Sequence, residues 1–205
     1  MLKIYGDIYS GNCYKIKLLA TQLAIPHAWI PIDILRRETH TEAFLKKNPN
    51  GRIPLLELDD GACLPESNAI MHYLAEGSAL LPQDKLQHAQ VLQWLFFEQY
   101  SHEPNIATAR YIVRYLGRPA DKEEQLQQKM APGYRALDVM ERHLAKHSYF
   151  VADEYTIADI GLYAYTHVAH EGGFDLASYP AIRAWLDRVR QQQAYLSMDD
   201  AKAKE

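Results

Sequence analysis

The stretch that decides the fold class of this chain spans residues 51–64. Its sequence is Gly51-Arg52-Ile53-Pro54-Leu55-Leu56-Glu57-Leu58-Asp59-Asp60-Gly61-Ala62-Cys63-Leu64. Two short apolar runs flank an Asp-Asp-Gly turn, which is the pattern of a β-hairpin. Pro54 stands just ahead of the first run, a position that a proline can occupy without removing a hydrogen bond from a sheet. We therefore expect an antiparallel pair of strands within residues 55–64.

Working outward from the hairpin, the first 77 residues alternate between strand-like and helix-like patterns. The remaining elements predicted there are strands at residues 3–5 and 28–30 and helices at residues 16–23, 41–47 and 67–76. The second of these helices is stopped by Asn48-Pro49-Asn50-Gly51, a dense cluster of turn-forming residues. The order β-α-β-α-β-β-α predicts a small mixed sheet with helices on its faces, in a domain of residues 1–77.

After this domain the character of the sequence changes. Residues 78–85 contain serine, proline and aspartate and form the expected linker. Strand patterns then disappear, and the predicted elements are helices over residues 86–115 and 123–146 and helices that begin at Thr156 and Tyr179. The tail from Met198 is polar, and we expect it to fray. Residues 86–205 are thus predicted to be an all-helical second domain.

Composition narrows the class of protein. Of 205 residues, 48% are hydrophobic and 23% are charged, as in soluble globular chains, and two cysteines are too few for a disulfide scaffold. A net charge of −4 is the wrong sign for a general nucleic-acid binder. The sequence has neither an apolar stretch of about 20 residues for a membrane span nor an N-terminal signal segment. We expect a cytoplasmic protein with reduced thiols.

The first candidate site is Tyr9-Ser10-Gly11-Asn12-Cys13, between the first strand and the first helix. Its spacing resembles a redox C-x-x-C motif in which serine replaces the first cysteine. A serine hydroxyl cannot form a mixed disulfide, but it can donate a hydrogen bond to a bound thiolate. The alternative is that Ser10 only caps the helix. Cys13 can be a reactive thiol near a helix N-terminus or a small apolar core residue, and Cys63 is expected to be buried.

Two further candidates lie at strand-to-helix and turn-to-strand junctions. The Ile53-Pro54 bond can be cis, which would leave the Ile53 backbone to pair with an extended peptide, or trans at the start of an edge strand. Glu66 and Ser67 precede a predicted helix. There, Ser67 can bind a carboxylate and Glu66 an ammonium group, as the α-amino-acid end of a ligand requires. The other interpretation is an ordinary helix cap.

A fourth motif, Asp153-Glu154-Tyr155-Thr156-Ile157-Ala158-Asp159, is interpreted as structural. The Thr156 side chain would cap the following helix while Asp159 returns a bond to the Thr156 N–H, as in a capping box.

Together and in this order, these motifs resemble the cytosolic glutathione transferases over nearly the whole chain, and the opening with Ser10 is most similar to their serine-type theta, phi and related bacterial branches. The resemblance implies a thioredoxin-like α+β domain followed by an all-α domain. It also implies that the chain binds glutathione and stabilises its thiolate. The thiolate would be conjugated to hydrophobic electrophiles or would reduce organic hydroperoxides, without a metal or cofactor.

The resemblance also assigns roles to residues. Ser10 would stabilise the thiolate, with Tyr9, Asn12 and Cys13 as alternatives. Glutathione would be bound by Ser10, His40, Arg52, Ile53, Pro54, Glu66 and Ser67. The electrophile pocket, expected between the two domains, would include Asn12, His102 and Tyr111, although a proline-kinked helix at a subunit interface explains the last two equally well. The family resemblance further implies a homodimer.

Two alternative functions remain open from the sequence. One keeps the fold but makes the protein a glutathione-dependent isomerase, dehalogenase or disulfide reductase. The other is a glutathione-binding module without turnover.

Overall fold

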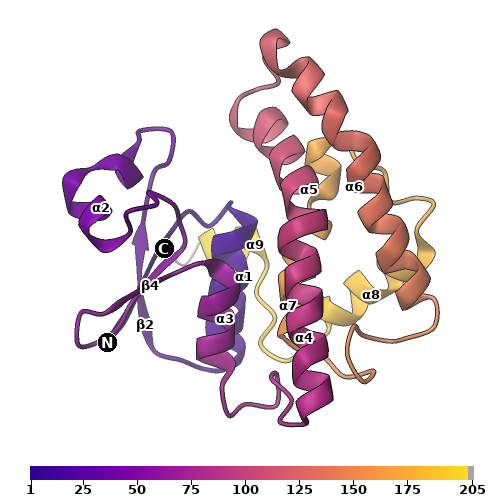
Figure 1. The fold of residues 1–205 in the computed structure, drawn as a ribbon, viewed down its shortest axis with the longest axis horizontal. Coiled ribbons are helices and arrows are strands. Elements are labelled where there is room, and N and C mark those ends of the chain that lie inside the picture. The colour runs from indigo at the N-terminus through magenta and orange to yellow at the C-terminus, as the bar shows by residue number, and fades with distance from the viewer. Residues whose placement is uncertain (203–205) are drawn as a thin grey trace. The chain divides into compact units, whose positions relative to one another are not determined.

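The structure, a computed structural model, describes residues 1–202, which form two compact units. Unit 1 contains residues 1–78 together with residues 193–202, and unit 2 contains Ala79–Gln192. The thioredoxin-like domain followed by a helical domain, as predicted, is confirmed (Figure 1). The sequence predicts a division into 1–77, 78–85 and 86–205. The boundary along the chain instead falls between Ser78 and Ala79, and residues 193–202 belong to unit 1.

Unit 1 is built on a four-stranded mixed sheet in the order β2-β1-β3-β4. Its strands are β1 (Leu2–Gly6), β2 (His27–Pro31), β3 (Leu55–Glu57) and β4 (Cys63–Pro65). β1 runs parallel to β2 and antiparallel to β3, so that Ile4 lies opposite both Trp29 and Leu56. The hairpin predicted within residues 55–64 is the antiparallel pair β3–β4.

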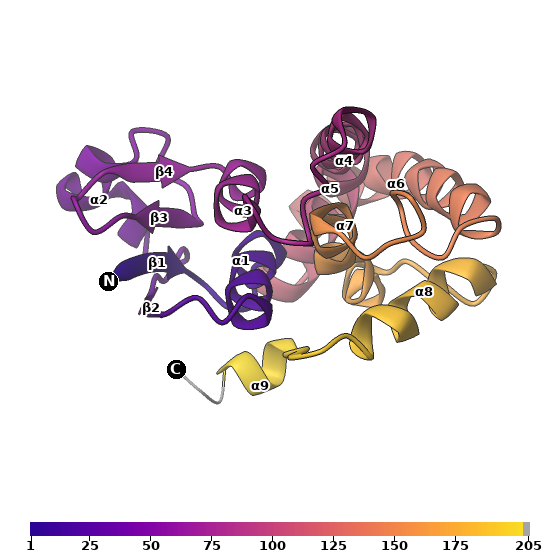
Figure 2. The same ribbon diagram turned by 90° about the horizontal axis from the view of Figure 1, so that it is seen from below.

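Helices cover both faces of this sheet. The helices of unit 1 are α1 (Gly11–Gln22), α2 (Glu42–Lys47), α3 (Ser67–Ala75) and α9 (Met198–Lys202), with a 3₁₀ turn at Glu38–His40. Figure 2 shows α1 and α3 on one face and α2 on the other. Because side chains alternate along a strand, Ile4 and Leu56 are buried on one face while Tyr5 and Glu57 point to the opposite one.

The face covered by α2 carries a charged cluster around Glu57. Its carboxylate accepts hydrogen bonds from Lys3 Nζ and from the Tyr5 hydroxyl, each at 2.7 Å, and from Lys47 Nζ of α2. The Tyr5 ring also meets the Phe44 ring of α2 edge-on at 6.3 Å. These contacts attach α2 to β1 and β3.

The expectation that the tail from Met198 frays is wrong. Residues 198–202 form α9, in which Met198 and Ala201 are buried. The Tyr14 hydroxyl of α1 donates a hydrogen bond of 2.7 Å to the Leu196 carbonyl. Apolar residues spaced through a polar tail therefore order it, because they pack within unit 1.

Unit 2 is helical and centres on α7 (Ile157–Thr166), every residue of which is buried. The other helices are α4 (Lys85–Phe97), α5 (Glu103–Arg110), α6 (Glu123–Leu144) and α8 (Pro180–Arg190), with 3₁₀ turns at Ala120–Lys122 and Ala169–Gly172. α7 packs against α4, α5 and α8 (Figure 2).

The helix predicted over residues 86–115 is interrupted. π-helical turns occupy Glu98–His102 and Tyr111–Tyr115, one on each side of α5. Pro104 has no N–H to continue the ladder of hydrogen bonds, which accounts for a widened turn just ahead of it. Pro132, by contrast, lies inside α6 without dividing it.

The capping box predicted at the start of α7 is confirmed. The Thr156 side chain accepts a hydrogen bond from the Ala158 N–H, and Asp159 accepts one of 3.0 Å from the Thr156 N–H. Trp185 Nε1 of α8 also donates to Asp159, at 2.9 Å. Burial is the main effect on the Asp159 carboxyl and raises its pKa to about 7. This motif holds together the interior of unit 2.

Candidate functional site

Ser10 ends the loop between β1 and α1 and occupies the position that precedes the helix. Its extended backbone (φ −73°, ψ 122°) lets its carbonyl accept bonds of 3.0 Å from the Cys13 N–H and 2.8 Å from the Tyr14 N–H. Its side chain does not accept a bond from the first turn of the helix. Ser10 is therefore the N-cap residue of α1, as the alternative from the sequence held, but its hydroxyl makes no capping bond and lies at the positive end of the helix.

Cys13, one turn further on, is a core residue, as one of the two interpretations held. It is completely buried, and burial raises the pKa of its thiol to about 12, although the Ser10 hydroxyl acts in the opposite direction. A methyl group at Gly6 would come within 2.9 Å of Cys13 Cβ and 3.1 Å of the Trp29 ring, which shows how tightly the thiol is enclosed. A buried neutral thiol is a poor nucleophile. Cys63, by contrast, is partly exposed.

The turn between α2 and β3 contains the second motif. The Ile53-Pro54 peptide bond is cis, so the first of the two alternatives from the sequence is confirmed. Gly51 ahead of it has φ +62°, and a Cβ there would lie 3.3 Å from the Thr39 carbonyl and 3.7 Å from His40 Cε1. The structure thus brings exposed His40 next to the turn that holds exposed Arg52.

The third motif joins β4 to α3. Glu66 has a positive φ of 71°, which is uncommon for a residue with a side chain and costs about 1–3 kcal/mol. Its side chain is exposed, whereas Ser67, the first residue of α3, is buried. Backbone strain of this kind is often found at ligand-binding positions. The conformation directs the chain from the edge strand into a helix whose first N–H groups are available to an anion.

A hydrogen bond links the first and third motifs. The Ser67 hydroxyl donates to Asn12 Oδ1 at 3.2 Å, so the first turns of α1 and α3 lie next to each other. Deeper along α1, the buried Lys15 ammonium donates to Asn68 Oδ1 of α3 at 2.8 Å. Two helix N-termini that point their free N–H groups toward one region form a receptor for negatively charged groups.

Sequence reasoning missed two residues at this site. One is Lys15, whose position among apolar neighbours gave no signal of its partner 53 residues away. The other is Asn48, whose buried amide bonds to both the Asn50 N–H and the Arg52 carbonyl. The Asn48-Pro49-Asn50-Gly51 sequence contains that signal, because asparagine side chains often bond to the backbone two residues ahead.

The candidate residues of unit 2 have different surroundings. His102 is completely buried in the first π-helical turn, and its Nε2 lies 2.9 Å from the Thr166 hydroxyl. Since that hydroxyl donates its hydrogen to the Leu162 carbonyl, Nε2 of His102 is the donor. Tyr111 is 39% exposed and stacks on Tyr115, with 5.5 Å between ring centroids.

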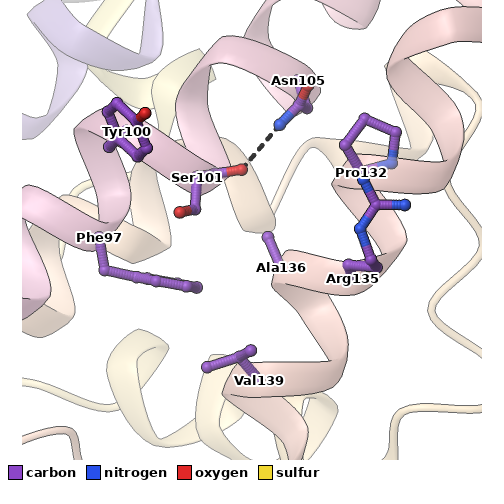
Figure 3. A pocket seen from close by; sticks show the side chains of 8 residues that line it. All are labelled: Phe97, Tyr100, Ser101, Asn105, Pro132, Arg135, Ala136 and Val139. Atoms are coloured by element: carbon purple, nitrogen blue, oxygen red, sulfur yellow. Dashed lines mark hydrogen bonds between the residues drawn. The ribbon is translucent and has the colours of Figure 1, made fainter.

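Unit 2 also contains a hollow of about 300 Å³ between α4, α5 and α6 (Figure 3). Its wall includes Phe97, Tyr100, Ser101, Asn105, Pro132, Arg135, Ala136 and Val139. Asn105 Nδ2 donates to the Ser101 carbonyl at 2.8 Å and thereby fixes one side of the opening. His102 and Tyr111 are not among these wall residues.

Residues 1–202 contain no cluster of three or more His, Cys, Asp or Glu side chains that could hold a metal ion. Over the same residues, no helix is both long and apolar enough to span a bilayer.

Comparisons with known proteins agree with this fold. The chain matches the family models of the glutathione S-transferase N-terminal domain over residues 9–76 and of the C-terminal domain over residues 104–193. A crystal structure of a glutathione S-transferase from Pseudomonas fluorescens is 56% identical, with a TM-score of 0.94 and coverage of 96% of this chain and 98% of that one.

More distant relatives match along most of their length as well. Glutathione S-transferase 3 of Zea mays is 29% identical, over 95% of this chain and 91% of the relative. The disulfide-bond oxidoreductase YfcG of Escherichia coli is 27% identical, over 92% and 91% respectively. The chain belongs to the glutathione S-transferase family.

Proposed function

We propose that this protein is a serine-type glutathione transferase that activates the thiol of glutathione and conjugates it to hydrophobic electrophiles. The single observation that carries the proposal is the bond between Ser67 and Asn12, which sets the N-termini of α3 and α1 side by side. Glutathione has a carboxylate on its γ-glutamyl residue and a thiol on the adjacent cysteinyl residue. To bind the carboxylate and the thiolate together, a protein needs two such anion receptors close to each other.

In the proposed complex, glutathione lies extended along unit 1. Its γ-glutamyl carboxylate is bound by Ser67 and its ammonium group by Glu66. The cysteinyl backbone pairs with Ile53, next to cis Pro54, in the way that an added strand pairs with a sheet edge. His40 and Arg52 on adjacent turns bind the glycine carboxylate.

Ser10 then stabilises the thiolate by donating its hydroxyl hydrogen. A free thiol has a pKa of about 8.5, and lowering it by about two units requires about 2.7 kcal/mol. One hydrogen bond to a charged group contributes about 1.5–3 kcal/mol, and the dipole of α1 adds about 0.3–1 kcal/mol. These contributions are sufficient for the proposed shift, so the reaction requires no metal or organic cofactor.

We further propose that the electrophile is a hydrophobic small molecule and that Tyr111 contributes to its site, with organic hydroperoxides as additional substrates. The completely buried His102, which bonds to Thr166, is instead a structural residue. Support comes from Tyr111, whose exposed ring and hydroxyl suit an apolar ligand with a polar group. We place the protein in the cytoplasm, where glutathione is abundant and where both thiols stay reduced.

The test is the Ser10→Ala variant, assayed with glutathione and an activated chloronitrobenzene. Loss of one hydrogen bond to the thiolate should lower turnover about tenfold to a hundredfold, while the affinity for glutathione changes less than threefold. Ser10→Thr retains a hydroxyl and is the matched control. Unchanged turnover in Ser10→Ala would exclude Ser10 and direct attention to Tyr9 or Asn12.

A second candidate function is the glutathione-dependent reduction of disulfides, which the similarity to the E. coli oxidoreductase favours. In that reaction the activated glutathione thiolate attacks a substrate disulfide, which forms a mixed disulfide and releases one substrate thiolate. A second glutathione thiolate then attacks the mixed disulfide, which releases the other substrate thiolate and forms oxidised glutathione. Because Cys13 is buried, Cys13→Ala should retain this activity. A chain that binds glutathione but turns over neither class of substrate would instead be a binding module.

A further inference from the structure

Asn48 makes four hydrogen bonds around the turn that leads to Ile53. It is 2% exposed and directly follows α2, and its N–H donates to the Phe44 carbonyl at 2.9 Å. Its own carbonyl accepts from the Gly51 N–H at 2.9 Å. Its side-chain Oδ1 accepts from the Asn50 N–H at 3.1 Å, while Nδ2 donates to the Arg52 carbonyl at 2.8 Å. The buried Asn48 side chain therefore connects the backbone of Asn50 to the backbone of Arg52.

The bond to the Arg52 carbonyl has a geometric consequence for Ile53. The Arg52 C=O and the Ile53 N–H belong to one planar peptide group, which is trans, and they point in opposite directions. A contact that fixes the oxygen therefore fixes the direction of the hydrogen. The Ile53 N–H points away from the buried Asn48 amide, on the far side of the peptide plane.

We propose that Asn48 is a positioning residue for glutathione: its amide fixes the Arg52–Ile53 peptide plane and thereby aims the Ile53 N–H at the cysteinyl carbonyl of the bound tripeptide. This inference rests on the function proposed above and adds a residue that does not itself touch the ligand. Because Asn48 acts on the backbone pairing and not on the thiol, it determines affinity for glutathione more than turnover.

Asparagine is the side chain that this position requires. It has one acceptor and one donor on a short planar group, so it can receive the Asn50 N–H and donate to the Arg52 carbonyl at the same time. Aspartate retains the acceptor but presents a second oxygen to the Arg52 carbonyl. Serine also retains an acceptor, but its side chain is too short to span the turn.

The experiment measures the dissociation constant of glutathione by calorimetry, and kcat at saturating glutathione, for the wild-type chain and Asn48→Asp. We expect affinity to fall about fivefold to tenfold, as for the loss of one well-oriented hydrogen bond, while kcat stays within twofold. Asn50→Ala is the matched control, because Asn50 is exposed and contributes only its backbone N–H. It should bind as the wild type does.

If circular dichroism shows that Asn48→Asp does not fold, the same titration is made with Asn48→Ser. We again expect the affinity for glutathione to fall while kcat stays within twofold. Equal affinities in wild type and variant would overturn the role of Asn48, as would a parallel loss of affinity and kcat, which indicates a structural role only. A wild-type chain that does not bind glutathione would instead refute the proposed function.

Discussion

Ser10 and Cys13 lie within one helical turn of each other and yet have opposite chemical environments. The serine ends an open loop, whereas the thiol points into the core between α1, Gly6 and Trp29. A sequence shows the spacing of the two residues but not the direction in which each points. The difference explains why a motif that resembles a redox dithiol acts, in our proposal, through a hydroxyl.

Cys13 should be chemically silent in the folded protein. With burial raising its pKa to about 12, the thiol remains protonated at pH 7–9, and no reagent can reach it. Titration with a coloured aromatic disulfide should therefore detect one thiol, that of Cys63, in the native chain and two after addition of denaturant. The Cys63→Ser variant is the control and should show none until it unfolds. Modification of Cys13 in the native state would contradict its placement in the core.

At the scale of elements, α2 is attached to the sheet by charged contacts as well as by the contact between Phe44 and Tyr5. Three hydrogen-bond donors converge on Glu57, and the bonds from Lys3, Lys47 and Tyr5 lower the pKa of its carboxyl to about 2. One of these donors, Lys47, belongs to α2 itself. The turn that leads to Ile53 directly follows α2, so the attachment of α2 to the sheet helps to position the proposed glutathione site.

Glu57→Gln should lower the free energy of unfolding by about 1–2 kcal/mol at pH 7, a modest value because both lysines are partly exposed to solvent. The folded pKa of about 2 lies below the unfolded value of about 4.3. The carboxylate thus stabilises the fold fully above about pH 4.5 and loses this effect as the pH falls toward 2. Urea unfolding of both chains from pH 7 to pH 3 should show the difference shrinking.

Glu42→Gln is the matched control for that measurement. Glu42 also pairs with a lysine of α2, Lys46, but its side chain is 86% exposed. Its substitution should change the stability by less than about 0.5 kcal/mol at any pH. Equal effects at the two positions, or a Glu57 effect that does not depend on pH, would show that the cluster does not act through charge.

The order and type of the elements could be predicted from the sequence because their signals are local. The capping box at Thr156 and Asp159 needs only four residues, and the hairpin of β3 and β4 needs a turn between two apolar runs. Contacts between distant residues could not be predicted in this way. Ser67 meets Asn12 across 55 positions, and nothing in either neighbourhood specifies the other.

The π-helical turns beside α5 escaped prediction for a related reason. The apolar residues Leu92, Phe96 and Tyr100 follow helical spacing into residues 98–102, and one extra residue in a turn changes that spacing only slightly. Pro104 was the visible signal, but a proline is compatible with a kink as well as with a widened turn. The C-terminal helix α9, by contrast, has a local sequence signal. Ser197 and Asp200 have the spacing of a helix-capping pair, and their side chains bond to each other at the start of α9.

At the scale of the whole molecule, we expect two chains to associate. The resemblance to the family implies a homodimer, and the exposed Phe96 and Tyr100 of unit 2, at 70% and 88%, are large apolar side chains that a partner could cover. Sedimentation equilibrium should give twice the chain mass of 23.5 kDa. Phe96→Glu should shift the mass toward that of one chain. Leu86, which is exposed at the other end of the same helix, provides the control, and Leu86→Glu should leave the mass unchanged. A single-chain mass for the wild type would refute the dimer.

The return of residues 193–202 to unit 1 has a consequence for synthesis of the protein. Domains usually begin to fold as they leave the ribosome, the N-terminal one first. Here the apolar residues of α9 and the carbonyl that receives the Tyr14 hydroxyl are translated only after all of unit 2. Unit 1 begins to form first but is completed only after the whole of unit 2 has been made, and until then the Tyr14 hydroxyl of α1 lacks the carbonyl that it bonds in the folded chain.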